Sequence, residues 1–229
     1  MRFPVLDGFC AIRQWLIAIA ISALTATPAI SSPLIDQAGT TKDKADARYI
    51  ALHQLLDGIK YRSEDDKVEL VNLFFNSVIE YKTDEKNWGV ADYWSTPSEL
   101  IEKGAGDCED FAIAKYYSLL ALGVPRNKLR LTYAYLTRSA NGKEKIEAHL
   151  VLSFFSRTSA DPLILDNVNP GVRQLSGRKD LEALLHFDTD GLLNVKTSDV
   201  YPIEKYAPWK NFLSRQIEAA SFVRVGYEF

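Results

Sequence analysis

The stretch GAGDCEDFAIAKYYSLLAL spans residues 104–122 and begins a helix directly after a glycine-rich break. Apolar side chains recur at helical spacing over its second half, and Gly123 is typical of a helix end. Cys108 therefore lies in the first turn of the predicted helix. Backbone N–H groups and the partial positive charge at a helix start stabilise a thiolate and a developing oxyanion.

Helical patterns also precede this stretch. Apolar residues predict helices over residues 44–60 and, with clearer three- and four-residue spacing, over residues 64–81. Residues 82–94 are polar and predict a loop. The sequence Thr-Pro-Ser-Glu from Thr96 is typical of a capped helix start, and this short helix should reach about Lys103.

The pattern changes after the cysteine helix. Apolar and polar residues alternate over residues 129–135, and strands are also expected over residues 146–155 and 163–165. Short helices are predicted for residues 179–187 and 210–222. Helices followed by an antiparallel sheet predict an α+β fold.

The N-terminal residues 1–29 have the features of a secretory signal peptide. A positively charged start is followed by an apolar run over residues 15–24 and by small residues that favour cleavage after Ala29. A retained membrane anchor is the alternative, but this run is shorter than the about 20 residues that span a bilayer. Residues 30–43 predict a flexible leader, and residues 44–229 a single domain.

Charge and cysteine content narrow the classes of function. The formal net charge is −3, and no basic tract is present, so nucleic-acid binding is not expected. Removal of the signal peptide takes away Arg2, Arg13 and Asp7, which leaves a net charge of −4. Cys10 is lost with that segment, so the mature chain has one thiol and no internal disulfide. A buried structural cysteine is the alternative to a reactive one.

Three histidines are candidates for a general base. His53 belongs to the first predicted helix, away from any acidic motif, and His186 is expected as a cap at a helix end. His149 lies within an apolar strand, where its ring nitrogens need hydrogen-bond partners. It is either a hydrogen-bonded core residue or a functional base.

Asp166 follows the predicted strand 163–165 and could lie beside the strand that carries His149. There it could accept the second imidazole N–H and fix the tautomer, although an aspartate before Asn167 is also typical of a turn. Nucleophile, base and acid then follow in the order Cys108, His149, Asp166. This order predicts a Cys-His-Asp triad.

Four motifs resemble the bacterial transglutaminase-like cysteine proteinases, and in particular their LapG-type branch. They are WSTPSEL at 94–100, GDCEDFAIAK at 106–115, HLVL at 149–152 and LDN at 165–167. The resemblance covers most of the mature chain. It implies a papain-like or transglutaminase-like core, with N-terminal helices packed on an antiparallel sheet and the three triad residues in the roles given above.

The resemblance also implies a calcium requirement, with Asp107, Glu109 and Asp110 as candidate ligands. Hard oxygen ligands suit Ca²⁺. The alternative is that these acids only complement the positive helix start. Carboxylates beside Cys108 oppose formation of a thiolate, and a bound cation offsets that effect.

By the same resemblance, the chain is expected to be a periplasmic cysteine endopeptidase. Its substrate would be the N-terminal region of a large repeat adhesin at the cell surface, so that cleavage promotes biofilm dispersal. An inner-membrane cyclic di-GMP receptor of the LapD type is the expected inhibitor. Trp94 and Trp88 are candidate substrate contacts or, alternatively, core aromatics. Transamidation, cell-wall amide hydrolysis and non-catalytic calcium-dependent binding are the alternative functions.

Overall fold

A computed structural model describes residues 39–140, 142–156, 160–187, 192–195, 199–201 and 207–222. The expected signal peptide and most of the expected leader lie outside these ranges. Within them, no helix combines the length and apolar character needed to cross a membrane.

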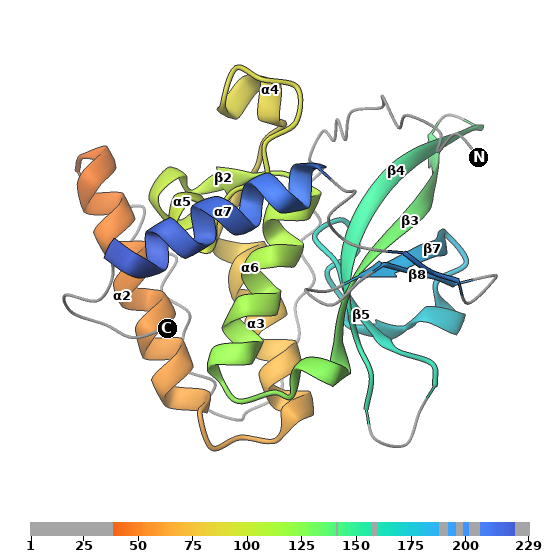
Figure 1. The fold of residues 1–229 in the computed structure, drawn as a ribbon, viewed down its shortest axis with the longest axis horizontal. Coiled ribbons are helices and arrows are strands. Elements are labelled where there is room, and N and C mark those ends of the chain that lie inside the picture. Colours follow the sequence, from red (N-terminus) through yellow and green to blue (C-terminus); the bar gives the residue numbers. More distant parts are fainter. Residues whose placement is uncertain are drawn as a thin grey trace.

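Helices form the N-terminal part of the fold and one C-terminal element (Figure 1). Their bounds are α2 Thr41–Ile59, α3 Glu64–Val78, α4 Asp84–Asn87, α5 Pro97–Lys103, α6 Cys108–Ala121 and α7 Ala207–Phe222. Reciprocal hydrogen bonds between Thr40 and Asp43 start α2, so this helix begins inside the expected leader. The same capping box between Thr96 and Glu99 starts α5 where the sequence predicted.

Seven antiparallel strands form the main sheet in the order β6-β5-β4-β3-β7-β8-β9. Their bounds are β3 Leu129–Ala140, β4 Lys143–Phe154, β5 Leu163–Leu165, β6 Arg173–Gln174, β7 Leu181–Phe187, β8 Leu192–Asn194 and β9 Val200–Tyr201. Helices first and an antiparallel sheet second confirm the predicted α+β architecture.

The helix predicted for residues 179–187 is wrong, because this segment is strand β7. The sequence Leu-Glu-Ala-Leu-Leu is rich in helix formers. In the fold it pairs with β3, where Leu181 and Ala183 are buried while Glu182 is exposed. Tertiary pairing therefore overrides the local helix propensity.

A small parallel ladder precedes the cysteine helix and was not predicted. Helix α3 ends at Val78, before the predicted end at residue 81, and β1 (Glu80–Tyr81) pairs with β2 (Ala105–Gly106). Arg48 from α2 supports the same region by donating to the carbonyls of Ile101 at 2.6 Å and Glu102 at 2.7 Å. It thereby satisfies carbonyls at the end of α5.

The main core lies between the helices and the sheet (Figure 1). Helix α6 is central in it, since it packs against α3 on one side and against β4 and β3 on another. Fully buried residues from both layers meet there, among them Val68, Phe74, Tyr116, Leu131, Leu152 and Phe154. Helix α7 lies across α5 and α6 and adds Trp209 and Phe212 to this core. These contacts fix the start of α6 relative to the sheet.

Candidate active site

The ladder of β1 and β2 positions the chain directly before Cys108. Lys82, the residue after β1, donates its N–H to the carbonyl of Gly106 at 2.8 Å. Gly106 is required here, because a Cβ at this position would come within 2.5 Å of the Asp110 carboxylate. Cys108 is then the first residue of α6, as predicted, and its side chain is largely buried.

Asp110 organises the start of α6. Its Oδ2 accepts a hydrogen bond from Asp107 N–H at 3.2 Å, and its Oδ1 accepts one from Ser95 N–H at 2.7 Å. The side chain is completely buried. Asp110 therefore complements the helix start, as one of the alternatives predicted, and also joins the chain before α5 to α6.

A group of acidic side chains surrounds this turn, and we call Asp84, Asp92, Asp107, Glu109 and Asp110 the carboxylate cluster. Ligand oxygens of Asp84, Asp92 and Glu109 lie within 4.8 Å of one another, and the same holds for Asp84, Asp107 and Asp110. Asp84 belongs to both sets. The cluster thus brings the three predicted metal ligands together with two that sequence reasoning missed.

Burial and mutual repulsion make ionisation of the cluster costly. Burial, with a contribution from the charge of Asp92, raises the pKa of Asp84 to about 6. Burial and the charges of Asp110 and Asp84 raise the pKa of Glu109 to about 8. The pKa of Asp110 is also raised well above its usual range, by burial and then by Asp107.

The donor set of the cluster fits a hard cation. Asp84 Oδ2 accepts a hydrogen bond from Tyr93 N–H at 2.6 Å, whereas its buried Oδ1 has no hydrogen-bond partner among the described residues. An orphaned carboxylate oxygen next to other carboxylates is costly without a positive charge. Several carboxylate oxygens in one place are the ligands that Ca²⁺ prefers.

Cys108 contacts this cluster directly. Its thiol donates to Glu109 Oε2, with the sulfur and oxygen 3.0 Å apart. An adjacent carboxylate that accepts this proton stabilises the thiol over the thiolate. The reactivity of Cys108 is therefore coupled to the charge state of Glu109.

His149 and Asp166 form the second half of the site. His149 is buried on β4, and its Nε2 lies 2.8 Å from Asp166 Oδ1. Asp166 directly follows β5, which pairs with β4 in the register Leu152–Leu165. The predicted pairing of His149 with an acid on the neighbouring strand is thus confirmed.

Asp166 is held from several directions. Val168 N–H donates to its Oδ1 at 2.9 Å and Arg178 donates to its Oδ2 at 2.8 Å, while Asn76 donates to its backbone carbonyl at 2.7 Å. Burial raises the pKa of Asp166, but the charge and hydrogen bond of His149 and the charge of Arg178 outweigh it. The pKa of Asp166 is therefore held well below its usual range. An ionised Asp166 makes Nε2 of His149 the donor and leaves Nδ1 as the nitrogen that exchanges a proton.

A buried lysine links this acid to the cysteine helix. Lys115 lies on α6 about 10 Å along the axis from Cys108, and it is completely buried. Its Nζ donates to Asn76 Oδ1 at 2.8 Å, and Asn76 in turn binds Asp166. Burial lowers the pKa of Lys115 to about 7. Asn76 thus connects α3, α6 and the end of β5.

The two tryptophans have different surroundings. Trp94 is buried, with its ring centroid 5.9 Å from Phe187 and 6.1 Å from Trp209, so it packs in the core. Trp88 is partly exposed and stacks on Tyr93 at 4.3 Å between centroids. Trp94 thus follows the core-aromatic alternative. Contact of either ring with substrate stays a prediction.

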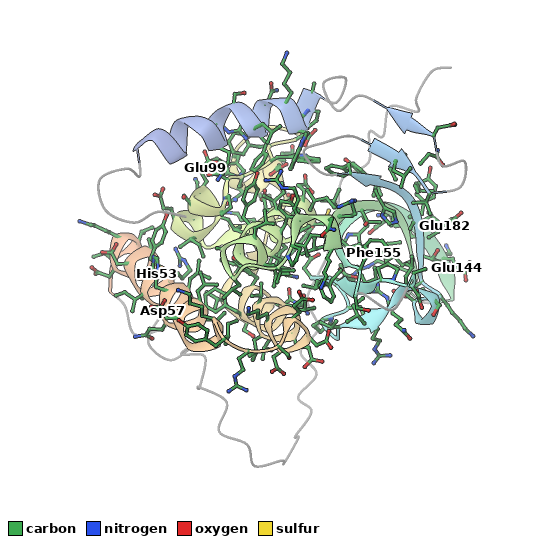
Figure 2. The ribbon with its side chains drawn as sticks, turned by 60° about the horizontal axis from the view of Figure 1, so that its bottom comes forward. His53, Asp57, Glu99, Glu144, Phe155 and Glu182 are labelled. Carbon is green, nitrogen blue, oxygen red and sulfur yellow. The ribbon has the colours of Figure 1, made fainter. Side chains whose placement is uncertain are left out.

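The other two histidines lie elsewhere. Figure 2 shows His53 on α2, on the side of the molecule away from the sheet. His186 was expected to cap a helix end, which is wrong because it lies on β7. Its Nδ1 is 2.9 Å from Thr132 Oγ1, and burial together with the charge of Arg130 lowers its pKa to about 4.

Comparisons with known proteins show the family that this chain resembles. A sequence model of the family described as bacterial transglutaminase-like cysteine proteinase matches residues 57–179. The structure of EGTA-treated LapG from Legionella pneumophila is 35% identical, with a TM-score of 0.63, over 80% of this chain and 94% of that one. Calcium-bound LapG from the same organism is 36% identical, with a TM-score of 0.64, over 80% of this chain and 96% of that one. No curated protein matches the sequence.

Proposed function

Because the chain belongs to the bacterial transglutaminase-like cysteine proteinase family, we propose that it is a calcium-dependent endopeptidase that uses Cys108, His149 and Asp166 as its triad. The observation that carries this proposal is the buried contact between His149 Nε2 and Asp166 Oδ1 at 2.8 Å. It orients an imidazole on a strand against which the cysteine helix packs. Cys108 at the start of that helix supplies the nucleophile.

The proposed mechanism is nucleophilic catalysis. Nδ1 of His149 takes the thiol proton as the Cys108 sulfur attacks the scissile carbonyl carbon. The imidazolium then protonates the leaving amine, and the C–N bond breaks to leave a thioester. Water, deprotonated by the same nitrogen, hydrolyses the thioester and restores the thiol. Backbone N–H groups at the start of α6 stabilise the oxyanion.

Calcium belongs in this proposal at the carboxylate cluster. The orphaned oxygen of Asp84 and the raised pKa values of Asp84 and Glu109 support a cation there. Asp84, Asp107, Glu109 and Asp110 would hold it, with Asp92 at the exposed edge. Bound Ca²⁺ supplies positive charge beside Cys108 and neutralises the carboxylates. The negative charge of Glu109 would then oppose the Cys108 thiolate less strongly.

The location, substrate and partner follow from the sequence resemblance and the signal peptide expected at residues 1–29. We place the mature protein in the periplasm. Its proposed substrate is the N-terminal region of a large repeat adhesin, whose cleavage releases the adhesin and promotes biofilm dispersal. An inner-membrane cyclic di-GMP receptor of the LapD type is the proposed inhibitor.

The test uses residues 30–229 and the N-terminal region of a candidate adhesin, with calcium or with excess EGTA, beside a Cys108→Ala control. Cleavage that needs both calcium and Cys108 supports the protease and the metal together. Cleavage in EGTA rejects the calcium requirement. Incorporation of an amine in place of cleavage favours transamidation, and cleavage by Cys108→Ala rejects the proposed nucleophile.

The alternative of a calcium-dependent binding module predicts a different result. In that case Cys108 is unreactive toward iodoacetamide, and alkylation leaves binding intact. Iodoacetamide labelling of the wild-type protein beside Cys108→Ala therefore separates an enzyme from a binding module, even if the adhesin chosen is not the substrate.

A further inference from the structure

Arg178 lies behind the proposed catalytic acid and had no role in the sequence analysis. It is 3% exposed, in the turn between the short helix Leu175–Gly177 and β7. One terminal nitrogen donates to Asp166 Oδ2 and to Asp180 Oδ2, each at 2.8 Å. Its Nε donates to Asp180 Oδ1, also at 2.8 Å.

We propose that Arg178 is a positioning residue of the catalytic site, which holds Asp166 ionised and directs its Oδ1 toward His149. This inference rests on the proposed function, because it gives Arg178 a part in the same reaction. The guanidinium contacts the carboxylates of Asp166 and Asp180. It acts through Asp166 alone.

The geometry supports this role because contacts other than the one with Asp166 hold the guanidinium in place. Both oxygens of Asp180 accept from one edge of the planar group, and the carbonyl of Asp180 accepts from Thr137 N–H on β3 at 2.8 Å. The backbone of Arg178 is held in addition by Leu175 and Leu181. A fork fixed in this way presents an N–H to one particular oxygen of Asp166.

The charges around Asp166 support the second part of the role. His149 faces it from β4, Arg178 from the turn before β7, and Lys115 from α6 through Asn76. Asp180 lies beyond Arg178 and adds a negative charge on that side. Lys115 is only partly charged near neutral pH, since burial lowers its pKa to about 7. Arg178 is thus the permanent cation in direct contact with Asp166.

The experiment compares Arg178→Gln with Arg178→Lys, and with Arg48→Gln as the matched control. Arg48 is also buried and also donates to two groups, but these are carbonyls of α5. For each variant, thermal unfolding, kcat, KM and the pH dependence of kcat are measured on the adhesin fragment in saturating calcium.

Arg178→Gln should lower kcat with little change in KM, and should move the acid limb of the kcat profile upward by about 1–3 pH units. The direction follows because loss of the positive charge beside Asp166 makes protonation of the His149–Asp166 pair easier. Arg178→Lys keeps the charge but loses the fork, so its acid limb should stay nearer the wild-type position while kcat falls. Arg48→Gln should lower the unfolding temperature without moving the acid limb.

A second readout needs no substrate. In a Cys108→Ala background, the ¹⁵N shifts of the His149 ring report its tautomer and its pKa, with His149→Ala for assignment. As the pH is lowered, Arg178→Gln should lose the signature of the Nε2–H tautomer at a higher pH than the parent protein does. If the adhesin is not cleaved by the wild-type protein, the substrate proposal fails, but this readout still tests Arg178.

Two results would overturn the inference. One is a lower unfolding temperature for Arg178→Gln with an unchanged acid limb and unchanged His149 shifts, since that describes a purely structural ion pair. The other is a wild-type kcat together with a wild-type tautomer signature in Arg178→Lys. This variant decides the question if Arg178→Gln does not fold.

Discussion

Buried carboxylates stand on both sides of the proposed site, and their electrostatics are opposite. At the start of α6, burial and neighbouring acids raise the pKa of Asp84 to about 6 and that of Glu109 to about 8. Beside the sheet, Asp166 is almost fully buried, yet its pKa lies well below its usual range. The residue types are similar, so the difference comes from their partners.

The partners differ in the sign of their charge. Asp166 has His149 and Arg178 in direct contact, whereas the charges that act on Asp84 and Glu109 are those of other carboxylates. The sheet half of the site (His149, Asp166 and Arg178) is therefore neutralised by the chain itself, whereas the helix half (Cys108 and the carboxylate cluster) would be neutralised by the proposed calcium ion. This comparison predicts that calcium controls one half of the site and leaves the other unchanged.

The largest expected effect is that of Asp166→Asn. An amide at this position loses the charge and favours the wrong imidazole tautomer, so kcat should fall on the order of 10³- to 10⁴-fold. Added calcium should not restore it. Calcium affinity, measured by calorimetry, should equal that of the wild type, and an altered affinity would show that the two halves are not independent.

Asp84→Asn tests the helix half. Loss of a ligand charge should weaken calcium binding at least about 10- to 100-fold. Activity should return at high calcium concentration, because the sheet half is intact. Titration of cleavage with calcium checks this, with Asp65→Asn on the solvent side of α3 as the control. A variant that stays inactive at saturating calcium would contradict it.

Calcium binding to the wild-type protein should also depend on pH, through the carboxylate cluster. Because the cluster must lose protons to bind the ion, affinity should rise as pH increases from about 6 to 8, by up to about tenfold per pH unit for each proton released.

The same shifts determine stability without calcium. The unfolded carboxyls ionise near pH 4. Between that pH and about 8, the unfolded chain binds fewer protons than the folded one, so the free energy of unfolding falls as pH rises. Thermal unfolding in EGTA should show this fall, and calcium should reverse it. A calcium-free protein that becomes more stable over this range would refute the electrostatic comparison.

Lys115→Met tests the sheet half through stability alone. The folded pKa of about 7 lies below the unfolded value of about 10.4. Between them the unfolded chain binds more protons, so the Lys115 contribution to stability increases with pH, by about 1.4 kcal/mol per pH unit. Any stability advantage of the methionine variant should therefore shrink from pH 7 to pH 10 in chemical denaturation. Parallel curves for the two proteins would exclude a titrating Lys115.

The sequence revealed the helix half of the site more fully than the sheet half. Cys108, Asp107, Glu109 and Asp110 are contiguous on one capped helix start, so their proximity follows from local structure. His149 and Asp166 were found because one lies on a recognisable strand and the other directly follows one. Arg178 and Asn76 were not, since only the tertiary fold brings them to Asp166.

The misses have related physical causes. Asp84 lies in a polar segment without periodicity, and only the ladder of β1 and β2 brings it to α6. The segment 181–187 has the composition of a helix and forms a strand because β3 offers an edge to pair with. Local patterns therefore predicted elements well where capping and periodicity agree, and failed where long-range pairing decides.

The two-residue ladder has one more consequence. It closes residues 82–104 into an excursion whose ends are fastened together, so that the excursion begins and ends next to Gly106. The segment holds the helices α4 and α5 and contributes no strand to the main sheet. Substitutions at its exposed or partly exposed positions, such as Asp92 and Trp88, can therefore alter metal affinity and the aromatic surface, while the buried Trp94 and Leu100 keep the segment in the core and the nucleophile keeps its place.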